Sequence, residues 1–185
     1  MNQISSKNLQ VRLIRPSLQY RKSFLTALWE FDKDKSWNME PKYKEAAKDP
    51  DKFIKRLLGF AKGKDLPPTY VPDTFYWLVE GNKYIGRVDI RHYLTPALRR
   101  KGGNIGYAIR PTQRGKGFGN LILKLVLPKA AKLGIKRALL TVDSKNTTSR
   151  KIIEKHGGKL IKHDKVAEPG FLRFWVPTGK IAKRN

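Results

Sequence analysis

A glycine-rich turn between a strand pattern and a helix pattern constrains this chain more than any other feature. The turn runs from Arg114 to Gly119, follows a strand pattern that Pro111 ends, and leads into an apolar helix pattern that reaches Leu133. Glycines let backbone N–H groups approach an anion, and a helix N-terminus adds partial positive charge. Arg114 and Lys116 add full charges. The turn therefore predicts a phosphate or pyrophosphate site, or else a tight connection that binds nothing.

Two common phosphate-binding motifs do not fit this turn. A Walker loop requires Ser or Thr after its Gly-Lys pair, and here Gly117 follows Lys116. A dinucleotide-binding fingerprint requires a third glycine at the position that Asn120 occupies. Both classes are therefore set aside.

The rest of the pattern predicts an α/β fold. Strands are expected at residues 9–15, 74–79, 84–92, 104–110, 137–142 and 171–176. Helices are expected after Ser17, at 50–60, from the glycine turn to 133 and at 146–156, with a loop over 31–48. Pro128 should kink or end its helix early. Strands alternate with helices in the second half, while the middle is rich in hairpins. A mixed, partly antiparallel sheet with helices on both faces follows.

Composition limits the classes of function. The 185 residues suit one domain spanning 1–185. The absence of cysteine excludes disulfides and a thiolate nucleophile, and we predict no metal site. No apolar run is long enough to cross a membrane, and the first residues lack the apolar segment of a secretory signal. We therefore expect a cytoplasmic protein without a membrane partner.

The chain is strongly basic. Forty Lys and Arg residues against fifteen Asp and Glu residues give a net charge of +25, spread along the sequence. Such a charge is either solvated surface or the mark of an acidic partner, for example a nucleic acid. Both interpretations stay open.

Two linked stretches resemble a known family. Residues 102–119 resemble the signature strand, loop and helix of the Gcn5-related N-acetyltransferases (GNAT). Further on, Asn146, Ser149 and the run Glu154-Lys155-His156-Gly157-Gly158 resemble the next strand and helix of that superfamily. The wider match looks like a subgroup of predicted bacterial acetyltransferases. It covers roughly residues 72–176, which would form the cofactor-binding core, whereas residues 1–70 would form a variable N-terminal strand and helices.

The resemblance implies that acetyl-CoA is the cosubstrate. Its pantetheine arm would lie where the sheet splays open beside residues 104–110, and its pyrophosphate would lie over the glycine turn. The residues implied to contact it are Tyr107, Ile109, Arg114, Gly115, Lys116, Gly117, Phe118, Gly119, Asn120, Asn146 and Ser149. Taken without the resemblance, Asn146 predicts a helix cap and Ser149 a surface residue.

The implied activity is transfer of acetyl to a primary amine. Without cysteine, the amine must attack the thioester directly in a ternary complex. Many members of the superfamily have a tyrosine acid where this chain has Ile153, and a carboxylate base where it has Asn104. The alternative is therefore a basic binding module, associated with nucleic acid or the ribosome, that kept the fold without turnover.

Four residues are candidates for catalysis or substrate contact. His92 is a candidate base, or else a histidine at a hairpin end that bonds to a loop. Tyr107 is a candidate acid, or else a core residue. Asn104 is a candidate to orient substrate, and Trp37 either forms a substrate wall or belongs to a small cluster under a loop. We expect an amine substrate as partner, with a second copy of the chain, in a homodimer, as a further candidate.

Overall fold

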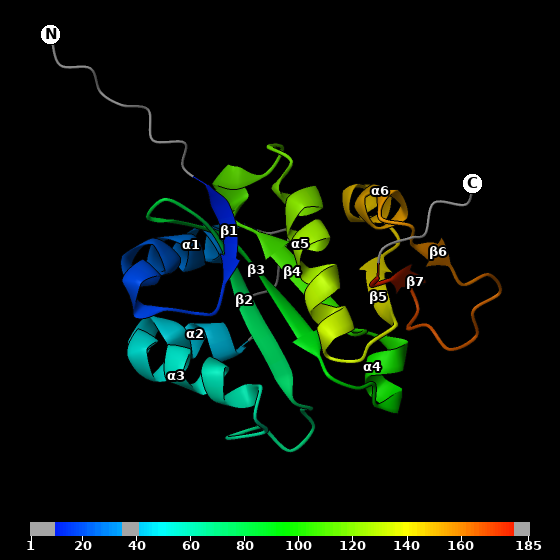
Figure 1. Cartoon of the computed structure of the whole chain (residues 1–185), viewed down its shortest axis with the longest axis horizontal. Coiled ribbons are helices and arrows are strands. Elements are labelled where there is room, and N and C mark those ends of the chain that lie inside the picture. Colours follow the sequence, from blue (N-terminus) through cyan, green and yellow to red (C-terminus); the bar gives the residue numbers. More distant parts are fainter. Residues whose placement is uncertain (1–9, 35–40, 180–185) are drawn as a thin grey trace, which may run out of the picture.

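Seven strands form two separate sheets in the computed structural model, which describes residues 10–34 and 41–179 (Figure 1). The first sheet has the order β1 (Val11–Ile14), β2 (Asp73–Glu80), β3 (Lys83–Arg91), β4 (Ile105–Ile109). The second has the order β5 (Arg137–Asp143), β7 (Phe171–Pro177), β6 (Lys159–Leu160). Every pair of neighbouring strands is antiparallel.

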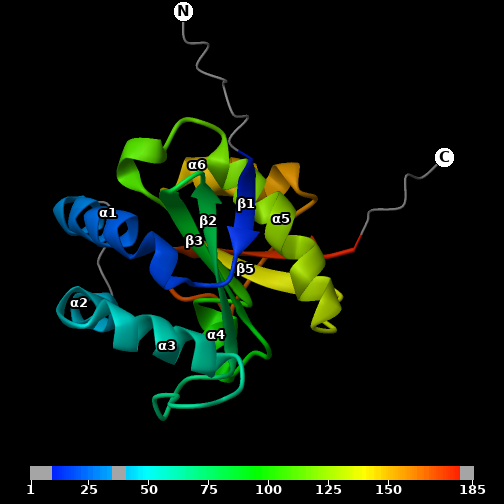
Figure 2. The same cartoon turned by 60° about the vertical axis from the view of Figure 1, so that its left-hand side comes forward.

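Helices cover both faces of the first sheet. One face carries α1 (Arg21–Lys33), α2 (Pro41–Lys48) and α3 (Pro50–Phe60), and the other carries α5 (Phe118–Lys132), as Figures 1 and 2 both show. Next to α5 and β5 packs α6 (Thr147–Lys155). Short helices complete the fold: η1 (Leu18–Tyr20), α4 (Pro96–Arg100) after β3, and η2 (Pro111–Gln113) before the glycine turn.

The alternation of side chains along β2 builds a core on each side of the sheet. Phe75 and Trp77 face the helices α1 to α3, where the rings of Trp77 and Phe24 stack with centroids 4.6 Å apart. Leu78 belongs to the opposite core together with Ile122 of α5. Because both faces are buried, β2 reads as a nearly continuous apolar run.

Among the described residues, backbone hydrogen bonds join the two sheets near the start of β4. The backbone N–H of Asn104 donates to the carbonyl of Leu139 in β5 at 2.7 Å, and the Leu139 N–H donates to the Asn104 side-chain Oδ1 at 2.9 Å. The Asn104 Nδ2 donates to the carbonyl of Arg91 in β3 at 3.2 Å. The side-chain amide thus replaces a strand residue at the joint, and no ladder pairs β4 with β5 beyond it.

The expected fold class is confirmed, including helices on both faces and a sheet that splays beside β4. Three details of the prediction were wrong. The expected loop over 31–48 contains α2, α4 and β6 lie in segments expected to be connections, and α5 does not end early at Pro128 but continues to Lys132. Pro128 is exposed, so the carbonyl that lost its N–H partner can turn to water.

Gly103 is a sensitive part of the joint, because a Cβ there would lie 2.2 Å from the Leu139 carbonyl oxygen and its φ is +64°. We predict that Gly103→Ala lowers the free energy of unfolding by about 3 kcal/mol, combining backbone strain and overpacking. Gly134→Ala is the matched control, since Gly134 has φ +81° and no atom within 4 Å of a built Cβ. It should cost only about 1 kcal/mol. Urea unfolding of both variants measures this, and equal losses would show that the joint tolerates a side chain.

Candidate functional site

The glycine turn is open to an approaching anion. Gly115 and Gly117 have φ values of +77° and +82°, and a Cβ built on either meets nothing within 4 Å. All residues from Arg114 to Gly117 are exposed. Gly117 is the N-cap of α5, and no side chain caps the helix there. The first N–H groups of α5 and the backbone of the turn therefore form a cradle for a negatively charged group.

A carboxylate on α1 holds the segment that leads into the turn. Glu30 Oε1 accepts hydrogen bonds from Arg110 Nη2 at 2.6 Å and Nε at 2.9 Å. Glu30 Oε2 accepts from the Thr112 hydroxyl at 2.9 Å. Burial raises the pKa of Glu30, but the hydrogen bonds from Arg110 and Thr112 outweigh it and hold the pKa below its usual value. This clamp fixes the end of β4 relative to α1.

The Arg114 side chain braces the turn. Its Nη1 lies 2.6 Å from Asp34 Oδ2, and its Nε donates to the Ile109 carbonyl at 3.2 Å. Lys116 donates to the Gln113 side chain at 3.1 Å and is exposed. In this arrangement Arg114 shapes the backbone, and Lys116 is the cation that projects from the turn.

The start of α6 lies against the start of α5. A Cβ on Gly119 would come within 2.7 Å of Ile152 Cδ1, so the two helices pack closely at this point. His156 Nε2 lies 3.1 Å from the Asn120 carbonyl; burial lowers the pKa of His156 and this hydrogen bond opposes the shift. The Asn120 side-chain Oδ1 is buried without a partner.

Asn146 caps α6 by accepting from the Ser149 N–H at 3.0 Å. The cap predicted from the residues alone is therefore present. It places the Ser149 side chain, which is half-buried, in the first turn of α6.

Tyr107 places a buried hydroxyl between β4 and α6. It packs against the core on the α5 side of the sheet, together with Ile109 and Ile105. Its hydroxyl is buried, with the Ser149 side chain as a polar neighbour. Burial raises the pKa of Tyr107, and the Ser149 side chain offsets part of the rise. The hydroxyl therefore lies between β4 and the first turn of α6, next to Ser149.

A charged cluster lies on the opposite side of β4. Asp89 is fully buried, with Arg87 Nη1 2.7 Å from its Oδ1 and Arg91 Nη2 3.0 Å from its Oδ2. Gly106 faces this cluster, because a Cβ there would lie 3.3 Å from both carboxylate oxygens of Asp89 and 3.5 Å from Arg91 Nη1. The charge ladder predicted from the alternation of these residues is present.

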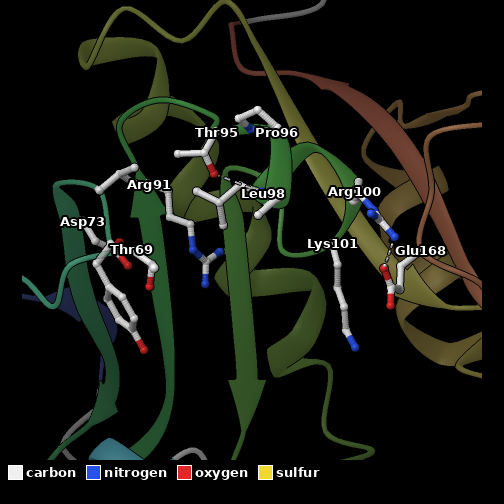
Figure 3. A pocket seen from close by; sticks show the side chains of 12 residues that line it. Thr69, Asp73, Arg91, Thr95, Pro96, Leu98, Arg100, Lys101 and Glu168 are labelled. Atoms are coloured by element: carbon white, nitrogen blue, oxygen red, sulfur yellow. Dashed lines mark hydrogen bonds and ion pairs between the residues drawn. The ribbon is translucent and has the colours of Figure 1, made fainter.

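A pocket of about 710 Å³ opens beside the cluster (Figure 3). Its walls come from the loop before β2, the end of β3, α4 and the loop before β7. The charged residues that line it are Asp73, Arg91, Arg100, Lys101 and Glu168. Arg91 belongs to both the cluster and the pocket lining, so the pocket lies next to the cluster, on the face of the sheet away from Tyr107.

The remaining candidates lie elsewhere. His92 Nε2 is 2.8 Å from the Thr74 hydroxyl, and burial, with Arg15 adding to it, lowers the pKa of His92. Thr74 alternates with Asp73, so this bond lies on the face opposite the pocket. Asn104 is 4 % exposed and both its amide atoms bond to backbone, which gives it a structural role. Trp37 lies outside the described residues.

Sequence reasoning missed Glu30 and the pocket. Glu30 lies 80 positions from Arg110, and no local pattern links them. The pocket combines four segments that only the fold brings together.

Comparison with known proteins gives the family. The profile of the acetyltransferase (GNAT) domain matches residues 13–159. The chain therefore belongs to the GNAT family, and the predicted class, an acetyl-CoA-dependent N-acetyltransferase, is confirmed. A search of curated protein sequences finds no match. In the part of the chain that the structure describes, no helix is long and apolar enough to cross a membrane.

Solved structures share the fold at low sequence identity. Mycobacterium smegmatis RimJ in complex with CoA-disulfide has a TM-score of 0.66 at 18% identity, covering 94% of this chain and 84% of that one. Microcin C7 self immunity acetyltransferase MccE, in complex with acetyl-CoA and AMP, has 0.65 at 15%, covering 92% and 93%. RimL, a ribosomal L7/L12 alpha-N-protein acetyltransferase in complex with coenzyme A, has 0.63 at 17%, covering 91% and 96%.

The clamp makes a prediction about acid stability. Because the native pKa of Glu30 lies below its ordinary value of 4.5, its stabilisation is present above that pH and is lost as the pH falls below it. Glu30→Gln should lower the free energy of unfolding by about 2 kcal/mol at pH 7. The difference in free energy of unfolding between Glu30→Gln and wild type should become smaller below pH 4.5.

Urea unfolding at pH 7 and at about pH 3.5 measures this difference. Glu154→Gln is the control, since Glu154 forms an exposed pair with Arg150 at 2.9 Å and should change stability by less than about 0.5 kcal/mol. A Glu30→Gln deficit of the same size at both pH values would exclude the ionised carboxylate as its source.

Proposed function

We propose that this protein transfers acetyl from acetyl-CoA to a primary amine by direct attack in a ternary complex. The observation that carries the proposal is the open glycine cradle at the start of α5, directly beside the edge of β4 that no other strand of the described residues covers. Acetyl-CoA needs both features, because it has a pyrophosphate and an extended amide-containing arm.

The edge of β4 supports the placement of the donor. The Arg110 N–H donates to Ile85 in β3, and backbone groups of successive strand residues point to alternate sides. Those of Tyr107 and Ile109 therefore point away from β3, into the gap. A pantetheine arm bound there would pair with β4 like an added strand. The Ile109 carbonyl already accepts from Arg114, so we assign the main contacts to the other backbone groups.

The pocket supports the placement of the acceptor. It lies on the face of the sheet opposite Tyr107, and its lining residue Arg91 lies close to Gly106 of β4. An amine that enters by the pocket approaches the thioester from the side away from α5. Arg91 lies at this end, and a nearby cation favours the neutral form of an amine, which is the nucleophile.

During the reaction the amine loses one proton and the leaving thiolate gains one. The amine nitrogen forms a bond to the carbonyl carbon, the carbon–sulfur bond breaks, and the amine gives a proton to solvent. We assign the Tyr107 hydroxyl as the donor that protonates the leaving thiolate. Its raised pKa keeps it protonated at neutral pH, and after the transfer it takes a proton back from solvent. His92 stays a candidate base from sequence, but its bond to Thr74 favours a structural role.

The alternative, a basic binding module without turnover, rests on the net charge of +25. The open cradle beside the free edge of β4 argues against this alternative. Binding of nucleic acid alone does not require a strand edge that can pair with a pantetheine arm. Binding to nucleic acid would weaken steeply with salt, whereas capture of acetyl-CoA by backbone groups would persist.

The cradle is tested by Gly117→Val, whose side chain would occupy the anion path. Acetyl-CoA affinity measured by calorimetry should fall at least about 30-fold, because several backbone hydrogen bonds to phosphate are lost. Gly134→Val is the matched control, with nearly the same φ, equally open surroundings and a position at the far end of α5. It should keep the affinity of wild type. Equal acetyl-CoA affinities for wild type and both variants would show that acetyl-CoA does not bind at this turn.

The acid is tested by Tyr107→Phe. We expect kcat to fall about 100-fold with unchanged affinity for acetyl-CoA. Removal of this hydroxyl should leave thermal stability nearly unchanged, because one side-chain hydrogen bond contributes only about 1 kcal/mol. His92→Ala should show the reverse pattern, with lower stability and kcat within about threefold. Unchanged kcat in Tyr107→Phe would end its assignment as acid, and a large kcat loss in His92→Ala would make His92 the base.

A further inference from the structure

The charged residues that line the acceptor pocket form two groups. In Figure 3, Asp73 and Arg91 lie on neighbouring strands at one side, whereas Arg100, Lys101 and Glu168 lie at the other. The first group adjoins Gly106, through Arg91. The second group lies at the end of α4 and in the loop before β7. The reacting end of the pocket and its outer end thus differ in their surroundings.

The outer wall is fixed by buried bonds. Arg173 of β7 is 8 % exposed; its Nε and Nη2 bind the Asp164 carboxylate at 2.5 Å each, and its Nη1 donates to the Arg99 carbonyl at 2.8 Å. The backbone N–H of Glu168 donates to the Arg100 carbonyl at 3.1 Å. Hydrogen bonds to Asp164 lower its pKa, so this anchor stays charged at neutral pH. A ligand would therefore meet a preformed wall.

The outer wall carries an uncompensated positive charge. Arg100 and Glu168 form an exposed pair at 3.0 Å, with side chains 58% and 38% exposed. Such a pair is weak and can share Arg100 with a ligand. Lys101 has no carboxylate partner among the described residues; its Nζ lies 4.3 Å from the centroid of the Phe171 ring. Lys101 is exposed and lines the pocket.

From this arrangement we infer that the acceptor carries a negatively charged group, a carboxylate or a phosphate, close to its amine. Lys101 and Arg100 bind this group at the outer wall, which directs the amine toward Gly106. A volume of about 710 Å³ holds an acceptor larger than one amino acid. The inference rests on the proposed function, because the pocket is an acceptor site only if the gap beside β4 holds the donor.

The test compares matched acceptors that differ in one charge. The probes are the tripeptides Ser-Asp-Ala and Ser-Asn-Ala, and phosphoethanolamine against ethanolamine. Calorimetry measures their binding to the protein saturated with CoA, so that no turnover is needed. For wild type, at least one charged probe should bind about tenfold more tightly than its neutral partner. The pair with the larger ratio distinguishes carboxylate from phosphate.

Two variants assign the effect to the wall. Lys101→Gln should bring the affinity for the charged probe close to that for its neutral partner. It should leave the affinities for the neutral probes and for CoA unchanged. Lys129→Gln is the matched control, since Lys129 also lies over a ring, that of Tyr76 at 4.9 Å, but on α5. It should keep the ratio of wild type.

Equal binding of charged and neutral probes, absence of binding by both charged probes at millimolar concentration, or an unchanged ratio in Lys101→Gln would each overturn the inference. Failure of the proposed function has a different signature, namely no heat from CoA and no acetylated product. Charge-selective binding of the probes would in that case be measured with the protein free of CoA.

Discussion

The structure depends on one side-chain amide that makes hydrogen bonds a backbone peptide group would otherwise make. At the point where β4 and β5 would begin to pair, the amide of Asn104 takes the place of a peptide group, bonding to Leu139 on one side and to Arg91 on the other. The sheets are held together there and diverge beyond it. A continuous ladder would close the gap, and complete separation would leave no fixed edge. The buried amide of Asn104 therefore lies at the point where the pairing of the two sheets ends.

Around this gap, charged groups fix the parts that must not move. Glu30 binds the exit of β4 to α1, Asp89 is held between Arg87 and Arg91, and Arg173 joins the last strand to the end of α4. Each of these pairs is largely buried and well bonded. Such pairs contribute less to net stability than to geometry, because desolvation offsets much of their attraction. Their common effect is to define the orientation of the segments on both sides of β4.

The sequence predicted what depends on local pattern. The glycine turn, its strand and its helix were found from residues 102–119 because backbone conformation there requires glycine, and the limits of α3 followed from Pro50 and the apolar spacing up to Phe60. The helix α2 was missed because charged residues dominate its eight positions and weaken the periodic signal. The pocket and the Glu30 clamp were missed for another reason. They join residues far apart in the chain, and no spacing rule encodes such contacts.

β4 lies between two separate openings, which affects the order in which ligands can bind and leave. The glycine cradle lies at the start of α5, whereas the pocket lies on the far face of the sheet. Under the proposed function, neither ligand crosses the route of the other. Such an enzyme imposes no fixed sequence of addition, and spent coenzyme can depart while the modified amine is still in place. The five-residue strand β4 then separates the routes of the two ligands.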